Sequence, residues 1–205
     1  MAKLYFRYGA MGCGKTRDLM KVWYNYNEKG KEVIVIKPGK DTKGNEKVVS
    51  RDSSQLMTDY IIRDNDNIYD MISRHIIDYN LDCILVDEAQ FLQRHHIEEL
   101  TDIVDVLDIP VICYGLRADF QDNLFTGSEA LFVYADIIEE MKTICECGDG
   151  ATRNVRFVNG EVSFTGEQVA IDGVSDTTYI SMCRNCRKKL VRKINKKIGN
   201  DKLLK

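Results

Sequence analysis

The sequence predicts an α/β fold: a doubly wound, mostly parallel sheet followed by a small C-terminal lobe that binds zinc. Short apolar runs alternate along the chain with helix-like segments. The runs lack in-out alternation, which is typical of strands that are buried on both faces of a parallel sheet. Two close cysteine pairs near the C-terminus predict the lobe. With 205 residues, 44% of them hydrophobic, the chain can bury one full core and a small annex.

The elements follow in order. Strands are expected over residues 3–8, 32–37, 83–86 and 111–114, and helices over residues 17–28, 68–79 and 97–107, with a further apolar segment over 128–138. A polar stretch covers residues 38–54. After residue 144 the segments become short, and Asn159-Gly160 lies between two apolar runs, which predicts a hairpin over residues 156–164.

A phosphate-binding loop is expected directly after the first strand. The eight residues Gly9, Ala10, Met11, Gly12, Cys13, Gly14, Lys15 and Thr16 fit the pattern G-x-x-x-x-G-K-[ST]. Glycines let successive backbone N–H groups point at phosphate oxygens, Lys15 can reach the outer phosphates, and the Thr16 hydroxyl can hold Mg²⁺. The alternative is a glycine-rich turn with an incidental Lys-Thr. The order of strand, loop and helix favours a nucleotide triphosphate site.

A second signal, a pair of acidic residues, follows the strand at 83–86. Asp87 lies where a strand's carboxyl end meets such a loop, so its carboxylate can position Mg²⁺ directly or through water. Glu88 follows it and could accept a proton from an attacking hydroxyl or water. The alternative is an Asp-Glu pair that only caps the next helix.

The cysteines predict a structural metal site. Cys183 and Cys186 have C-x-x-C spacing, and Cys145 and Cys147 are one residue closer together. Four thiolates from two turns can close a tetrahedral Zn²⁺ site with no open position. Such a metal stabilises a lobe that is too small to bury its own core. Buried or redox-active cysteines are the alternative.

Charge divides the chain unevenly. The formal net charge is −3, but residues 187–205 hold nine basic residues and one acidic residue, a local charge of +8, against 20 basic and 31 acidic residues, or −11, before them. No aromatic residues lie between the tail's charges, so a solvated helix or frayed end is favoured over nucleic-acid binding. The chain shows no apolar leader and no run of about 18 apolar residues, so no membrane association and a cytoplasmic location are expected.

Three domains are expected: residues 1–143 as the domain with the phosphate loop, residues 144–190 as a zinc-binding lobe, and residues 191–205 as a basic tail.

Taken together, these motifs resemble a known family. Met11 in the loop, the strand ending Asp87-Glu88-Ala89-Gln90-Phe91, the turn over residues 115–120, and Tyr179 four residues before Cys183 are similar to the thymidine kinases of the type II, zinc-containing class. The resemblance covers residues 3–190. It implies ATP-dependent phosphorylation of the 5′-hydroxyl of thymidine in pyrimidine deoxynucleoside salvage, Mg²⁺ with ATP, a structural Zn²⁺, a homotetramer, and inhibition by dTTP.

The resemblance also implies roles for individual residues. Glu88 is the expected catalytic base, and Thr16 and Asp87 lie on the magnesium side. ATP and phosphate contacts fall on the eight loop residues together with Lys43, Asp87 and Gln90. Nucleoside contacts fall on Met11, Phe91, Leu116, Phe120, Phe125, Val169, Ile171, Gly173 and Tyr179; the first five surround the thymine ring, and the segment at 169–173 closes over the base. Zinc falls on Cys145, Cys147, Cys183 and Cys186.

The sequence departs from the family pattern at three places. Ala10 and Gly12 replace the usual Pro and Phe of the loop, and Cys13 is expected to lie beside phosphates, where a thiol tends toward thiolate. Lys43 replaces the common Arg, so a two-pronged phosphate contact becomes a point charge. The C-x-C pair shortens one zinc turn.

Two other classes of function remain as alternatives. A DNA-dependent ATPase of the helicase type would share the loop and the Asp-Glu pair, but a typical helicase motor needs two such domains and this chain has one. A zinc-bearing nucleic-acid-binding module would use the cysteines and the basic tail. ATP turnover separates the three: stimulated by thymidine, stimulated by DNA, or absent.

Overall fold

The structure is a computed structural model that describes residues 1–41, 46–50, 53–166, 168 and 176–198. These residues form two compact units. Unit 1 contains the described residues within 1–9, 14–117 and 124–141, and unit 2 contains those within 10–13, 118–123 and 142–205. Lys43, Val169, Ile171 and Gly173, all predicted site residues, lie outside the described residues.

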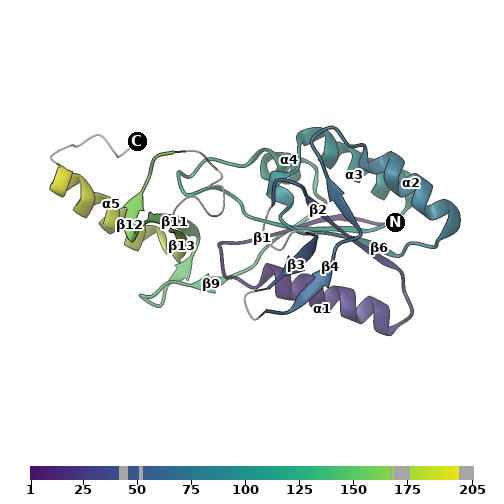
Figure 1. Cartoon of the computed structure of the whole chain (residues 1–205), viewed down its shortest axis with the longest axis horizontal. Coiled ribbons are helices and arrows are strands. Elements are labelled where there is room, and N and C mark those ends of the chain that lie inside the picture. Colours follow the sequence, from purple (N-terminus) through teal and green to yellow (C-terminus); the bar gives the residue numbers. More distant parts are fainter. Residues whose placement is uncertain (42–45, 51–52, 167, 169–175, 199–205) are drawn as a thin grey trace. The chain divides into compact units, whose positions relative to one another are not determined.

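Unit 1 is built on a six-stranded sheet in the order β5-β2-β6-β7-β1-β8, and every neighbouring pair is parallel (Figure 1). The strands are β1 (Leu4–Tyr8), β2 (Val33–Pro38), β5 (Tyr60–Ile62), β6 (Cys83–Val86), β7 (Val111–Gly115) and β8 (Ile137–Glu140). All residues of β2, β6 and β7 are buried. The predicted α/β class with a mostly parallel sheet is confirmed.

Alternate residues of these strands pack against two different layers. Ile34, Ile84 and Val86 pack with the helices α2 (Ile68–Asp78), α3 (Arg94–Leu107) and α4 (Thr126–Tyr134). Val35 and Leu85 pack on the other face with α1 (Lys15–Glu28) and with the antiparallel pair β3 (Lys47–Val49) and β4 (Gln55–Met57). Figure 1 shows α1 on one face of the sheet and the other three helices opposite it. A sheet covered on both faces explains why the strands read as continuous apolar runs.

Unit 2 holds the late strands and the last helix. β11 (Arg153–Val158) pairs antiparallel with β12 (Glu161–Ser163) and with β13 (Thr177–Met182), and β9 (Thr143–Ile144) pairs antiparallel with β10 (Gly150–Ala151). The predicted hairpin is confirmed as β11–β12. Its tip, Asn159 and Gly160, has φ of 52° and 78°, and two positive φ values in succession are what a tight type I′ turn requires.

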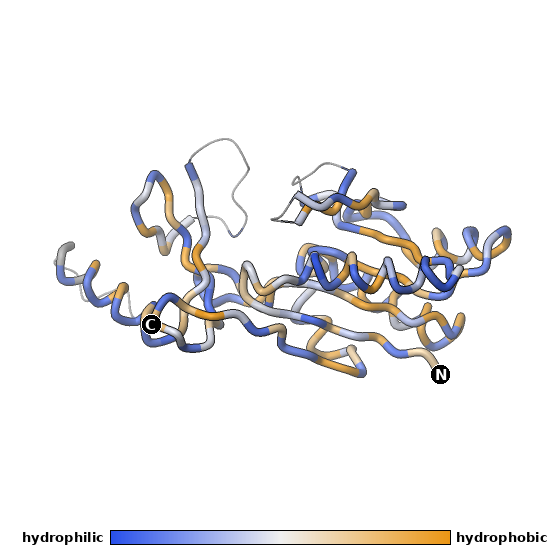
Figure 2. Tube along the Cα trace, turned by 90° about the horizontal axis from the view of Figure 1, so that it is seen from below, coloured by the Kyte–Doolittle hydropathy of each residue, from blue (hydrophilic) through white to orange (hydrophobic). Residues whose placement is uncertain are grey.

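The helix α5 (Arg184–Ile198) follows β13 and carries most of the basic residues near the C-terminus. Figure 2 shows this helix as mainly hydrophilic, with a few short hydrophobic segments. No helix within the described part of the chain is long and apolar enough to cross a membrane.

Two sequence expectations need correction. The apolar segment at 128–138 holds two elements, most of the helix α4 and the start of the strand β8, because Ala135 ends the helix in extended backbone and the Asp136 side chain accepts a hydrogen bond from the Leu4 backbone. The polar stretch at 38–54 hides β3, whose Val48 is buried under the sheet.

Candidate active site and metal centre

The glycine-rich loop joins β1 to α1. Gly12 has φ of 78° and Gly14 has φ of 86°, a left-handed conformation that residues with a Cβ adopt only at a cost. Gly14 is the N-cap of α1, so the N–H groups that open that helix belong to Lys15 and Thr16. Lys15 is buried, and its Nζ donates to the Gly9 carbonyl over 3.3 Å. A helix N-terminus with a buried lysine at its first position is a site for an anion.

The start of α1 is tied to the sheet. Asp18, in the first turn, accepts hydrogen bonds from the Arg7 guanidinium at 2.8 Å and from the Tyr114 hydroxyl at 2.9 Å. Burial raises the pKa of Tyr114, and the Asp18 charge raises it further, so the phenol stays a donor. These contacts hold the helix that carries Lys15 and Thr16 against β1 and β7.

Asp87 lies immediately after β6 and is buried. Its backbone N–H donates to the Ile36 carbonyl at 3.0 Å, whereas its Oδ1 has no hydrogen-bond partner. Burial raises the pKa of Asp87 to about 7, and the charges of Glu88 and Asp41 add to the rise. A buried carboxylate oxygen that lacks a donor fits a hard cation such as Mg²⁺, which prefers oxygen ligands.

Glu88 has an unusual backbone. Its φ of 48° and ψ of 38° place it in the left-handed region, where a residue with a Cβ is strained by about 1–2 kcal/mol. It immediately precedes the short 3₁₀ helix η1 (Ala89–Phe91). Such strain is found at functional sites when the surrounding structure fixes it.

The Gln90 side chain holds two other residues. Its Nε2 donates to Glu88 Oε2 at 2.5 Å, and its Oε1 accepts from the Leu116 N–H at 2.9 Å. The Leu116 carbonyl in turn accepts from the Ser128 hydroxyl at 2.5 Å. Both side chains, Gln90 and Ser128, are buried. The sequence motif marked Gln90 as a phosphate contact and carried no signal for its bond to Leu116, which is 26 residues away.

The predicted nucleoside contacts fall in both units. In unit 1, Leu116 and Phe125 are buried, and the rings of Phe91 and Phe125 meet edge to face with centroids 5.5 Å apart. In unit 2, Phe120 is buried and Tyr179 is half-buried on β13, opposite Arg156 of β11.

Three further polar residues of unit 2 adjoin predicted contacts. Asp119 lies in the turn over residues 115–120 that carries the resemblance, whereas no sequence motif pointed to Arg156 or Asn154. The Arg156 guanidinium lies 3.8 Å from the Phe120 ring centroid. Asn154 Oδ1 accepts a hydrogen bond from the Met11 N–H at 2.9 Å. Asp119 is buried and accepts from the backbone N–H groups of Gln121 and Asn123 at 2.8 and 2.9 Å. Because the contacts of Arg156 and Asn154 are with residues distant in the chain, only the fold reveals them.

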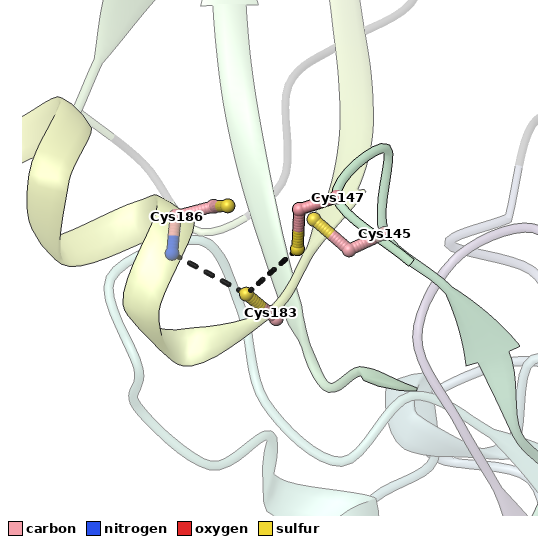
Figure 3. Close-up of side chains that lie close together, drawn as sticks. All are labelled: Cys145, Cys147, Cys183 and Cys186. Carbon is pink, nitrogen blue, oxygen red and sulfur yellow. Dashed lines mark hydrogen bonds between the residues drawn. The ribbon is translucent and has the colours of Figure 1, made fainter. Parts of the chain in front are cut away.

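The four predicted zinc ligands come together in unit 2. One ligand atom of each cysteine lies within 4.8 Å of all the others. Cys145 and Cys147 lie on one turn, which Gly148 closes with an N–H to the Cys145 carbonyl at 2.9 Å, and Cys183 and Cys186 lie where β13 leads into α5 (Figure 3).

Sulfur atoms around a tetrahedral zinc are about 3.8 Å apart, given Zn–S bonds of about 2.3 Å. The Sγ atoms of Cys147 and Cys183 are 3.6 Å apart, and the Cys186 N–H donates to Cys183 Sγ at 3.3 Å. Backbone N–H groups of Cys147 and Cys183 lower the pKa of the Cys145 thiol, whereas the thiols of Cys147, Cys183 and Cys145 raise the pKa of Cys186. A coordinating metal deprotonates its thiol ligands outright. The donor set fits zinc.

Comparisons with known proteins agree with this site. The family model described as Thymidine kinase matches residues 2–187. A thymidine kinase of Lactiplantibacillus plantarum is 44% identical, one of Lactobacillus acidophilus 45% and one of Francisella tularensis subsp. holarctica 41%; each match covers 90% of this chain and 95% of the relative. A solved structure, a crystal structure of a DNA replication initiation factor, matches 69% of this chain and 40% of its own, with 16% identity and a TM-score of 0.38, a likeness too small to bear on fold or function.

Proposed function

The chain belongs to the thymidine kinase family and is an enzyme, and we propose that it transfers the γ-phosphate of ATP to the 5′-hydroxyl of thymidine, giving dTMP and ADP in pyrimidine deoxynucleoside salvage. One observation carries the chemistry: Asp87, buried and with Oδ1 unpartnered, stands next to Glu88 at the end of β6, and the Lys15 charge acts on the Asp87 carboxylate. A cation-binding acid beside a candidate base, at the carboxyl end of a parallel strand, suits phosphoryl transfer.

The proposed reaction is a direct in-line transfer. The 5′-oxygen of thymidine attacks the γ-phosphorus of ATP, the bond from that phosphorus to the bridging β-phosphate oxygen breaks, and ADP leaves. Glu88 accepts the hydroxyl proton. Lys15 and the N–H groups at the start of α1 stabilise the charge on the transferred group. Thr16 and Asp87 would hold Mg²⁺, which would neutralise phosphate charge when bound with ATP.

The zinc is proposed to be structural. Four thiolates leave no open position for substrate, so its contribution is to join the turn at Cys145–Cys147 to the start of α5. The loop residues, Lys43 and the nucleoside contacts predicted from the sequence stay predictions, as do the three-domain division, the cytoplasmic location, the homotetramer and inhibition by dTTP.

The test is phosphate transfer from γ-labelled ATP to a panel of nucleosides, with dTMP identified by chromatography. Thymidine should be the best acceptor. 5′-Deoxythymidine is the matched control, because it keeps the base and lacks the accepting oxygen, and it should give no labelled nucleotide. Turnover stimulated by DNA would favour the ATPase, absence of turnover with DNA binding would favour the zinc-bearing binding module, and either result would overturn the proposal.

A further inference from the structure

The transfer reaction does not explain why buried polar side chains bind the backbone of Leu116. Leu116 follows β7, where its backbone has left the ladder of strand hydrogen bonds. Both of its backbone groups are instead held by buried side chains, the N–H by Gln90 Oε1 and the carbonyl by Ser128 Oγ. Fixing a single backbone position with two buried side chains is a means of placing it accurately.

The orientation of the Gln90 carboxamide follows from these bonds. The Leu116 N–H can only donate, so the atom that faces it must be the amide oxygen. The amide nitrogen therefore faces Glu88 Oε2, at 2.5 Å, and a carboxylate can only accept. One oxygen of Glu88 is thereby held, and its carboxylate takes one orientation.

The position of Gly115 supports the importance of the contact between Gln90 and the end of β7. A Cβ on Gly115 would lie 2.9 Å from Gln90 Oε1 and 3.2 Å from the Gln90 backbone nitrogen. The end of β7 thus approaches Gln90 as closely as a residue without a side chain allows. Gln90 itself is 1% exposed, and both ends of its carboxamide are bonded within the protein.

We infer that Gln90 is a positioning residue, not an ATP contact through its side chain, and that it links the thymine-side residue Leu116 to the catalytic base Glu88. This inference rests on the proposed function. The side chain orients the carboxylate that receives the 5′-hydroxyl proton, and the same carboxamide fixes the backbone of a residue expected against the base. Orientation of this kind is worth about 10- to 100-fold in rate.

Three variants separate the two ends of the carboxamide. Gln90→Glu keeps an acceptor for the Leu116 N–H but turns a second carboxylate toward Glu88. It should lower kcat about 10- to 100-fold and leave KM for both substrates within about threefold of the parent. Gln90→Leu removes both bonds and should also raise KM for thymidine. Gly115→Ala disturbs the carboxamide from outside and should lower kcat while Gln90 is intact.

Gln93→Leu is the control, because Gln93 is a glutamine three residues further along the chain whose Nε2 donates to Asp64 Oδ1 at 3.2 Å, and this variant should keep the parent's kcat. Thermal shift by Mg-ATP should be unchanged in all variants. The inference would be overturned if Gln90→Glu kept the parent's kcat, or if it raised KM for ATP with kcat unchanged. If Gln90→Leu does not fold, the results for Gln90→Glu and Gly115→Ala decide. If the parent fails to phosphorylate thymidine, the proposed function itself has failed. If the parent phosphorylates thymidine and the Gln90 and Gly115 variants behave as the parent does, only the inference has failed.

Discussion

Asn154 holds the backbone of Met11: its Oδ1 accepts the Met11 N–H at 2.9 Å, across 143 residues of sequence. Asn154 is buried on β11, beside the strand that carries Tyr179. Met11 and Tyr179 are both predicted nucleoside contacts, so one side chain of unit 2 fixes a residue of the glycine-rich loop that is expected to touch the base.

Asn154→Ala should therefore weaken thymidine binding. A hydrogen bond of this kind contributes about 0.5–1.5 kcal/mol, equal to a rise in KM for thymidine of about 2- to 12-fold. Asn154→Asp keeps an acceptor oxygen and should stay closer to the parent. Steady-state kinetics check this, and equal KM values for the Ala variant and the parent would show that the Met11 contact does not matter for binding.

Glu88→Gln removes the proposed base without changing the shape of the side chain. We expect kcat to fall by about 10²- to 10⁴-fold, because proton acceptance by a positioned side chain is worth that much. Binding of Mg-ATP, followed by thermal shift, should be nearly unchanged. If kcat stays within about threefold of the parent, another group accepts the proton.

Removal of one thiol should release the metal. The parent should contain about one zinc per chain, and Cys183→Ser should contain almost none, because Cys183 is close to Cys147 and also receives the Cys186 N–H. Cys83→Ser is the control: Cys83 is buried in β6 and outside the cluster, so its loss should leave the zinc content unchanged. Elemental analysis of protein purified without chelator measures this, and zinc-free parent protein would exclude a structural zinc.

Sequence patterns predicted the parts of this molecule that depend on local chemistry. The buried strands β2, β6 and β7 were visible because both of their faces need apolar side chains, and the four cysteines were visible because metal ligands are spaced in pairs. The strand β5 has only three residues, too few to show a period. The helix α4 and the strand β8 were merged because both are apolar where they meet.

Long-range contacts could not be predicted in the same way. Gln90 stands in a motif, but its partner Leu116 is determined by how β7 lies beside β6. Asn154 and Ser128 stand in no motif at all. Their roles come from hydrogen bonds that exist only after the chain has folded.

Native stability should depend on pH through His96. This histidine is buried, and burial, followed by the charge of His95, lowers its pKa, although a hydrogen bond to the Asp66 carbonyl and the charges of Asp64 and Asp66 oppose the shift. The Gln93 N–H donates to Nδ1 at 3.2 Å, so Nε2 carries the proton and faces the Asp66 carbonyl at 3.1 Å. Protonation of Nδ1 would end that capping contact at the start of α3.

The sign follows from the lowered pKa. Above the unfolded pKa of about 6.5, His96 is neutral in both states and the free energy of unfolding is unaffected. As the pH falls through that value, the unfolded state takes up the proton first, so stability decreases until the lowered folded pKa is reached. Urea unfolding from pH 7.5 to 5 should show this decrease. His96→Gln should reduce it, whereas His95→Gln should retain most of it, because burial is the main cause. An equal slope in His96→Gln would assign the pH dependence to other groups.

Gly127 should respond to alanine against the usual rule for helices. It lies in the first turn of α4, where Gly→Ala ordinarily stabilises by about 0.5–1 kcal/mol. Here a Cβ would lie 2.3 Å from the Ala89 carbonyl and 3.0 Å from that of Gln90, so either α4 or η1 must move. We expect Gly127→Ala to lower the free energy of unfolding by about 1–3 kcal/mol, and to lower kcat because η1 follows Glu88 directly.

Gly150→Ala is the control, since a Cβ there meets nothing within 4 Å. Both variants are measured by urea unfolding and steady-state kinetics. A stabilised Gly127→Ala protein with full activity would mean that α4 and η1 do not pack as closely as this, and that the position of Glu88 does not depend on their contact.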